Sequence, residues 1–307
     1  ICASGTLGQI IPPSIVLILL SDVLQGAYSQ SQLMQGKIPS HPISTVDLFA
    51  GALVPGLILV LSYCLWQLYL TFVKPQTCPA VLKFNTKKSM IENCKIILFP
   101  IFLILAVLGS ILVGIATPTE AASVGVCGSI LLSYIKETFN IHMLKKSMIE
   151  TMSISSMIFL ILIGAKIFSL VFIGLEGREM ISDFMEKIPG GTFGSIFFVM
   201  ALIFLLGFFL DFIQIIYLII PIVGPIILQM DVNPLWFGIM IAINLQTSFL
   251  TPPFGFALFY FRGVATYKIK TLDIYKGVIP FIIIQITILL LIAKFPQLAT
   301  WLPNKIY

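Results

Sequence analysis

The chain has 307 residues, of which 58% are hydrophobic and only 10% are charged, and its mean hydropathy is +1.06. A typical globular domain has about 25% charged residues, so this composition excludes a soluble protein with one anchor. It predicts an all-α polytopic membrane protein with one membrane domain over 1–307. The net charge is +5, but the basic residues lie between apolar runs, which argues against nucleic-acid binding.

Several apolar runs are long enough, or nearly long enough, to cross a bilayer, which takes about 20 residues in a helix. They are 48–73, 96–116, 119–136, 151–173 and 275–293. The run 119–136 is shorter and rich in small residues, which favours close helix packing. The stretch 195–229 is predicted either as one long broken helix or as two short pieces.

Charged loops predict how these helices are oriented. Basic loops are cytoplasmic by the positive-inside rule, and acidic or charge-poor loops are then external. The basic loops are 74–95, 136–146 and 262–276, and the external ones are 21–47 and 174–194. With these assignments 195–229 crosses once, and 235–262 enters and leaves from the inside as a re-entrant hairpin.

Two proline pairs interrupt apolar segments near the two ends of the chain. Pro12-Pro13 lies within Gly5–Ser14, and Pro252-Pro253 lies within Thr247–Gly255. Proline removes an amide donor and blocks the helical hydrogen bond behind it. In lipid, freed backbone groups are tolerated only where protein or a water-filled cavity satisfies them. Paired interruptions in matching places of two halves are typical of a transporter's binding site.

The spacing of the two pairs predicts an internal repeat. Pro12 and Pro252 are 240 residues apart, and each pair precedes a helix start of the pattern Gly51–Pro55 or Gly277–Pro280. We predict an inverted-topology repeat with two re-entrant hairpins; the alternative is coincidence, because Pro-Pro is common. Residues 1–20 are then the second arm of the first hairpin, and 96–229 holds scaffold and transport helices of the second repeat. The offset implies that roughly 130–150 residues precede Ile1 in the whole protein.

Asp211 is the one acidic residue deep in an apolar stretch, which makes it a functional-site hypothesis; the alternative is a helix-end residue. Sodium takes oxygen ligands, and broken helices supply free carbonyls together with hydroxyls. The candidate sodium ligands are Ser4, Gly5, Thr6, Gly8, Asp211, Thr251, Pro252 and Gly255.

Three further polar residues are candidates for contact with a substrate. Asn244 is equally suited to a helix–helix hydrogen bond. Lys166 could pair with a carboxylate, bind an anionic substrate or extend to an interface. Arg262 could bind a carboxylate bidentately or anchor a helix end. The residues predicted to contact the substrate are Pro12, Pro13, Asn244, Pro253, Arg262 and Lys166.

Other motifs have ordinary structural interpretations or are absent. Thr117-Pro118-Thr119-Glu120 predicts a capping box at a helix start; the alternative is a role near the substrate path. Cys78 and Cys94 could pair, but their loop is basic and therefore expected to be cytoplasmic, where disulfides are rare. The sequence has no P-loop, no G-x-S-x-G elbow, no H-E-x-x-H and no metal-ligand spacing of His and Cys. We therefore expect no enzyme activity and no cofactor other than coupling sodium ions.

The motifs together resemble the large membrane subunit of the TRAP (tripartite ATP-independent periplasmic) transporters. The matching segments are Ser4–Leu17, Gly114–Ala122, Leu210-Asp211, Trp236-Phe237-Gly238 and Leu250–Gly255. Each is weak alone, but they run in order through most of the chain.

This resemblance implies a sodium-driven importer of organic acids in the bacterial inner membrane. In that family a periplasmic binding protein delivers the substrate, and a small four-helix membrane subunit braces the large one. The hairpin domain moves like an elevator, and sodium binds at the hairpin tips, which correspond here to Ser4–Pro13 and Thr251–Gly255. The chain alone, without the expected N-terminal part, should not transport.

Two other functions fit the sequence less well. A related two-hairpin elevator symporter or exchanger would work without a binding protein. A channel or an intramembrane enzyme would not couple to sodium, and an enzyme would need a nucleophile and a base that the sequence does not offer.

Overall fold

The computed structural model describes residues 1–38, 43–77, 90–265 and 269–306, and in these ranges it contains helices and no strands. The all-α prediction is therefore confirmed for the described residues. The chain packs as two compact units: Ser62–Ser155, and Ile1–Leu61 together with Ser156–Tyr307. The single domain expected over 1–307 stays a prediction.

The unit Ser62–Ser155 is built around two antiparallel apolar helices. These are α4 (Met90–Leu112) and α5 (Pro118–Ile135), and short η2 (Pro75–Thr77) precedes them. Small residues of α5 allow the approach: a methyl group at Gly125 would lie 3.4 Å from Val107, and one at Gly128 would overlap Leu103. The packing role predicted for small residues in 119–136 is confirmed.

The predicted capping box begins α5. The Thr117 hydroxyl accepts from the Glu120 amide at 3.4 Å, and the Glu120 carboxylate accepts from the Thr117 amide at 2.8 Å, with Pro118 at the first helical position. Cys78 and Cys94 lie outside the residues whose side chains are described, so their pairing stays open.

The other unit begins with a short interrupted element and a long helix. Its first elements are α1 (Cys2–Thr6), η1 (Leu7–Gln9) and α2 (Ile15–Met34). Helix α2 continues 14 residues past the predicted boundary at residue 20. The reason is a buried face that includes Leu24, Ala27 and Ser31 and packs against α10. Most of the loop expected over 21–47 is therefore helical.

Three long helices are apolar enough to cross a membrane among the described residues, or four if one bent pair is counted. They are α3 (Thr45–Val73), α6 (Ile141–Gly174) and α13 (Thr271–Lys294), and the bent pair is α9 (Phe212–Leu218) with α10 (Ile220–Gln229), bent by 56°. These agree with the predicted spans 48–73, 151–173 and 275–293. Two short helices were not predicted: α7 (Gly177–Glu186) and α14 (Gln297–Ile306).

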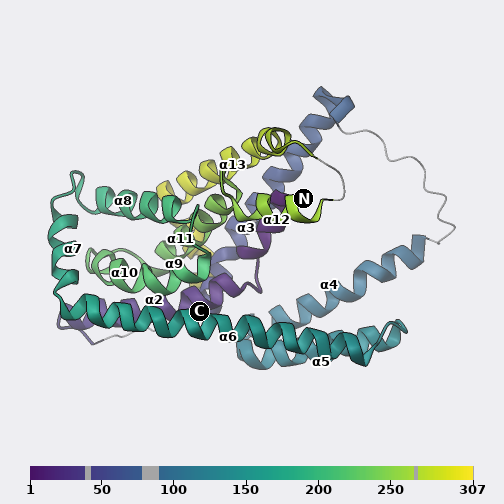
Figure 1. Cartoon of the computed structure of the whole chain (residues 1–307), viewed down its shortest axis with the longest axis horizontal. Coiled ribbons are helices and arrows are strands. Elements are labelled where there is room, and N and C mark those ends of the chain that lie inside the picture. The colour runs from purple at the N-terminus through teal and green to yellow at the C-terminus, as the bar shows by residue number, and fades with distance from the viewer. Residues whose placement is uncertain (39–42, 78–89, 266–268, 307) are drawn as a thin grey trace. The chain divides into compact units, whose positions relative to one another are not determined.

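The stretch 195–229 folds back on itself. Helix α8 (Gly191–Leu206) runs parallel to α11 (Pro234–Leu250), since Phe193 lies near Trp236 and Gly207 meets Ser248. The pair α9–α10 runs the other way and returns toward the start of α11 (Figure 1). The chain therefore reverses at 207–211, which differs from the single crossing expected from loop charges.

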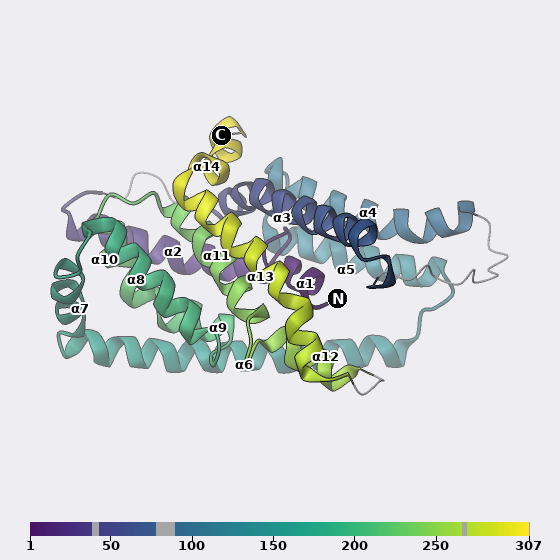
Figure 2. The same cartoon turned by 90° about the horizontal axis from the view of Figure 1, so that it is seen from above.

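The segment 235–262, expected to be the hairpin, runs in one direction along α13 (Figure 2). Trp236 donates its indole N–H to the Ile292 carbonyl at 2.8 Å, and the Tyr275 hydroxyl donates to the Pro253 carbonyl at 2.8 Å. Helix α12 (Phe256–Val264) continues past this point to the start of α13, where Arg262 lies near Thr271. The proline pair breaks the helix here without reversing the chain.

Candidate functional site: three helix breaks that meet

The first break lies between η1 and α2, at residues 10–14. Ser14 is the N-cap of α2: its hydroxyl donates to the Gln9 carbonyl at 2.6 Å and accepts from the Leu17 amide at 3.4 Å. Both Pro-Pro peptide bonds of the chain, Pro12-Pro13 and Pro252-Pro253, are cis. The hydroxyl thus satisfies backbone groups that the proline pair leaves outside the helix.

The second break lies between α11 and α12, at residues 251–255. The Thr251 hydroxyl donates to the Thr247 carbonyl at 2.7 Å, and the Gly255 amide donates to the Thr251 carbonyl at 3.1 Å. A methyl group at Gly255 would lie 2.7 Å from the Phe249 carbonyl oxygen, so only glycine fits this turn. The role of Gly255 as a sodium ligand stays a prediction.

The third break is the turn at 207–211, and it packs against the second. A methyl group at Gly207 would overlap the Ser248 side chain. The rings of Phe209 and Phe254 lie 5.3 Å apart between centroids, and an aromatic cluster with Phe249 continues the contact. Residues separated by more than 40 positions therefore form one small region.

The first break belongs to the same region. Helix α1 contacts both α11 and α12, the helices on either side of the second break. Helix α9, which follows the third break, packs against α2, which follows the first, and Tyr217 of α9 lines the same cavity as Asp22 of α2. All three helix breaks meet inside one unit of the chain.

Asp211 lies half-buried at this meeting point. It is the N-cap of α9, and its backbone N–H donates to Gln214 Oε1 at 3.1 Å. The helix-end alternative is thus confirmed, and the residue is also next to the second break. Its neighbours Phe209 and Phe212 pack against Phe254 and Phe249, which flank the second break, with ring centroids 5.3 and 6.0 Å apart.

The candidate sodium ligands that precede the first proline pair lie in regular helical backbone, where an irregular segment was expected. Ser4, Gly5 and Thr6 lie in α1, and the Ser4 and Thr6 hydroxyls donate to carbonyls three residues earlier, at 3.0 and 2.9 Å. A methyl group at Gly5 or Gly8 would meet no atom within 4 Å. The close approach that explains Gly255 does not explain these two glycines.

Two buried glutamines near the breaks were missed by sequence reasoning. Gln9 Oε1 and both amide atoms of Gln246 are buried without a hydrogen-bond partner among the described residues. Gln9 directly precedes the first break, and Gln246 lies five residues before Thr251. Buried polar atoms normally have a partner, so these oxygens are available to a water molecule or a cation. The only sequence signal for these two glutamines is that each is a polar residue within an apolar segment.

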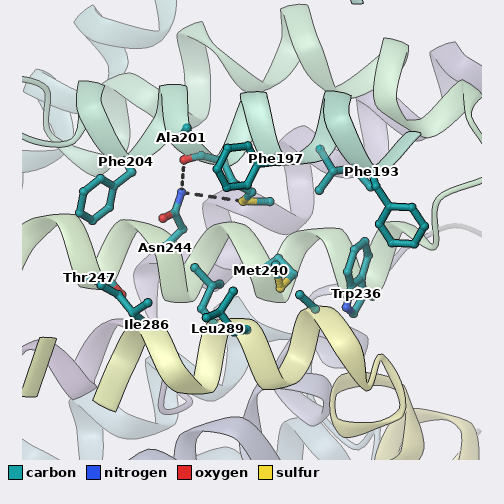
Figure 3. A pocket seen from close by; sticks show the side chains of 14 residues that line it. Phe193, Phe197, Ala201, Phe204, Trp236, Met240, Asn244, Thr247, Ile286 and Leu289 are labelled. Carbon is teal, nitrogen blue, oxygen red and sulfur yellow. Dashed lines mark hydrogen bonds between the residues drawn. The ribbon is translucent and has the colours of Figure 1, made fainter. Parts of the chain in front are cut away.

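The candidate substrate residues are not gathered in one place. The side-chain amide of Asn244 donates to the Met200 carbonyl at 2.7 Å (Figure 3). This is the helix–helix hydrogen bond that was the alternative to a substrate contact. Pro253 and Arg262 line a small cavity of about 90 Å³ beside Tyr275. Pro12 is buried and Pro13 exposed at the first break. Lys166 lies elsewhere, in a cavity between α2 and α6.

The pocket around Asn244 is unsuited to a charged substrate. It has a volume of about 470 Å³, and Phe193, Phe197 and Phe204 of α8 face α11 and α13 across it (Figure 3). Its two polar residues are already bonded, because Asn244 bonds Met200 and Thr247 donates to the Ile243 carbonyl. In the described part of the chain, no cluster of three His, Cys, Asp or Glu side chains could hold a metal ion.

Comparison with known proteins agrees with the architecture. A family model described as "Tripartite ATP-independent periplasmic transporter, DctM component" matches residues 1–298. The sialic acid TRAP transporter permease protein SiaT of Haemophilus influenzae is 27% identical over 303 residues, covering 98% of this chain and 46% of SiaT.

Two further relatives carry different substrate names. The C4-dicarboxylate TRAP transporter large permease protein DctM of Vibrio cholerae is 26% identical, over 99% of this chain and 67% of DctM. The isethionate TRAP transporter permease protein DctMQ of Oleidesulfovibrio alaskensis is 27% identical, over 97% of this chain and 44% of DctMQ. The chain thus spans about half to two thirds of these relatives. It belongs to the DctM family of TRAP transporter large permeases, which are membrane transporters and not enzymes.

Proposed function

We propose that the chain is part of the large permease of a sodium-coupled transporter that imports an organic acid across the bacterial inner membrane. The observation that carries the proposal is the meeting of three helix breaks around Asp211 and Thr251. In a membrane, irregular backbone persists where it lines a polar site, and broken helices supply the carbonyls that bind sodium.

The hydroxyl and amide groups near the breaks are suited to a hard cation. The hydroxyls of Thr251 and Thr6 donate their protons to carbonyls, which leaves oxygen lone pairs free to face an ion. Gln9 and Gln246 add buried amide oxygens without partners among the described residues. Asp211 supplies the negative charge that makes the binding of a cation favourable in an apolar surrounding.

The substrate class follows from the relatives. Their names give sialic acid, C4-dicarboxylates and isethionate, which are all organic anions. We propose an organic acid, with carboxylates as the leading group. The words "tripartite" and "periplasmic" in the family description support two partners, a periplasmic binding protein and a small membrane subunit of four helices.

The movement that we propose is an elevator motion within an inverted repeat. Two interrupted elements, α1–α2 and α11–α12, each carry a proline pair. Helix α2 runs antiparallel to α11, because Leu24 lies beside Gly238 while α1, which precedes α2, contacts α12, which follows α11. Each is followed by a long helix with an internal proline, Pro55 or Pro280. Opposite chain directions around equivalent breaks are what an inverted repeat requires.

The driving force is the sodium gradient. Each sodium ion that enters supplies about 2.3 kcal/mol per 100 mV of membrane potential, before its concentration gradient is counted. Three or more sodium ions per divalent acid, or two or more per monovalent acid, would keep the net charge movement inward. Current recordings that show no sodium-dependent charge entry would contradict this stoichiometry.

The test is uptake by the full-length permease with its partner subunits in proteoliposomes, with the sodium gradient switched on or off. We expect accumulation of a labelled organic acid only with an inward gradient, and a loss of roughly tenfold or more in Asp211→Ala and Thr251→Ala. Matched controls are Asp183→Ala, an exposed carboxylate of α7, and Thr287→Ala, whose hydroxyl donates to the carbonyl four residues earlier, also at 2.7 Å.

Two outcomes would overturn parts of this proposal. Uptake that ignores sodium would remove the coupling site, and uptake that proceeds without the binding protein would favour the binding-protein-independent symporter or exchanger. Equal loss in the variants and in their controls would show that the effect is general and not specific to the breaks.

A further inference from the structure

A second, polar cavity lies away from the helix breaks. It has a volume of about 640 Å³ and is lined by residues of α2, α6, α7, α9 and α10, all within one unit of the chain. Three charged residues line it: Asp22 from α2, Lys166 from α6 and Arg178 from α7. Ser29, Gln30, Ser169 and Tyr217 add neutral hydrogen-bonding groups. The volume falls in the range of small-molecule sites, about 300–1,000 Å³.

The two cations of this cavity lack protein partners. In the described residues, Lys166 and Arg178 form no ion pair, and Arg178 Nε is buried without a hydrogen-bond partner. Burial lowers the pKa of the Arg178 guanidinium below its ordinary value. Lys166 lies eight residues before the end of α6, which is about 12 Å along a helix. A buried guanidinium N–H without an acceptor is costly, and the exposed ammonium of Lys166 lies at the same cavity, so the cavity is suited to an anion.

The net charge of the cavity restricts which ligands it can bind. Two cations and one carboxylate give a net charge of +1, which one negative charge neutralises. A dianion would bring a second negative charge close to the Asp22 carboxylate, and like charges repel, so the lining favours a monoanion. Asp22 accepts hydrogen bonds only, when ionised, so it favours a ligand that also carries a donor group.

We propose that this cavity is a binding site for a hydroxylated organic monoanion. Arg178 and Lys166 bind its carboxylate or sulfonate, and Asp22 accepts a hydrogen bond from a hydroxyl group. The inference rests on the proposed function, because the ligand is the transported anion before it reaches the breaks. The acidic segment 174–194, which contains α7 and Arg178, is external by the charge rule, so the cavity takes the anion from the outer side.

The first test measures substrate selectivity in the full-length transporter with its partner subunits. Uptake of N-acetylneuraminate, a hydroxylated monoanion, is compared with uptake of succinate, a dianion, at saturating sodium. We expect Arg178→Gln and Lys166→Gln to raise KM by roughly ten- to a hundredfold, as for lost charged hydrogen bonds, without a change in the sodium concentration that gives half-maximal rate. Lys187→Gln, an exposed cation of the same segment, is the matched control.

The Asp22→Asn variant tests substrate selectivity, which would not change if Asp22 had only a structural role. Removing this carboxylate raises the cavity charge to +2, so we expect the ratio of succinate to N-acetylneuraminate uptake to rise severalfold. An unchanged ratio, or an unchanged KM in both cation variants, would overturn the proposal while leaving sodium coupling intact. Loss of sodium dependence in the unmodified protein would instead contradict the proposed function.

The second test detects occupancy without transport. In a variant freed of its native cysteines, Ser169→Cys is labelled from outside with a charged methanethiosulfonate, with Lys187→Cys as the exposed control. N-acetylneuraminate should slow labelling of Ser169→Cys and leave Lys187→Cys unchanged. The membranes are made of phosphatidylcholine with or without phosphatidylglycerol. Protection by the anionic lipid but not by the organic anion would assign the cavity to a lipid headgroup and overturn the proposal.

Discussion

Gly255 is the residue at which the geometry of the second break is most sharply defined. A methyl group there would lie 2.7 Å from the Phe249 carbonyl and 3.0 Å from the Thr251 carbonyl. We expect Gly255→Ala to lower stability by about 1–3 kcal/mol, as overpacking does, and to reduce uptake. Thermal unfolding and uptake of the purified transporter check both. Gly263→Ala, where no atom lies within 4 Å, is the control, and equal behaviour of the two variants would contradict the prediction.

At the same scale, sequence reasoning succeeds where the interaction is local. The capping box of Thr117 and Glu120 needs only residues three apart, and it forms as predicted. The cation pair of Lys166 and Arg178 could not be predicted as a pair, because α6 and α7 meet at one cavity only through the path of the chain. The sequence left two possible roles for Asn244, because its hydrogen-bond partner Met200 lies 44 residues away in the chain.

Helix α5 permits a test of the capping box as a structural element. Thr117→Ala removes an oxygen that accepts from the Glu120 amide, and such losses typically cost about 1 kcal/mol. Hydrogen exchange of the first turn of α5 should speed up roughly fivefold, which is that energy expressed as a ratio. Thr119→Ala, an exposed neighbour, should exchange at the unmodified rate. Faster exchange over the whole chain would indicate general destabilisation instead.

The turn between α8 and α9 permits a second test. Gly207 is packed so closely that an added methyl group would overlap Ser248, whose Cβ would be 2.6 Å away. We expect Gly207→Ala to push the turn away from α11 and to reduce uptake. Adding Ser248→Gly removes both overlapping atoms, so the double variant should recover activity, as coupled neighbours do. Failure of the double variant to exceed either single variant would show that this contact is not what limits uptake.

The direction of these elements was the part of the fold that the sequence predicted least well. The charges of the loops predicted a re-entrant hairpin at 235–262, the segment that contains the second proline pair. A proline pair ends a helix by removing hydrogen bonds, but the direction of the next helix depends on its packing, here that of α12 against α1. The reversal lies instead at 207–211, where Gly207 allows the tight approach.

At the scale of the whole molecule, the breaks form one region because α2, α10 and α11 pack along their lengths. Ala27 Cβ lies 3.1 Å from the position of a Cβ at Gly224, and Leu24 packs at Gly238 in the same way. Such contacts join the first interrupted element to the second. If the elevator proposal is right, these helices move as one body and do not slide past each other.

A disulfide between α2 and α10 tests this directly. In a cysteine-free variant of the full-length transporter, Ala27→Cys with Gly224→Cys places two Cβ atoms within a few tenths of an ångström of the usual disulfide range, about 3.5–4.5 Å. We expect the oxidised pair to form and to retain sodium-dependent uptake, because the bridge lies inside one moving body. Each single cysteine variant controls for the substitutions themselves. Uptake that is lost on oxidation and restored by dithiothreitol would mean that α2 and α10 must separate during transport, and the helix breaks would then belong to two bodies that move against each other.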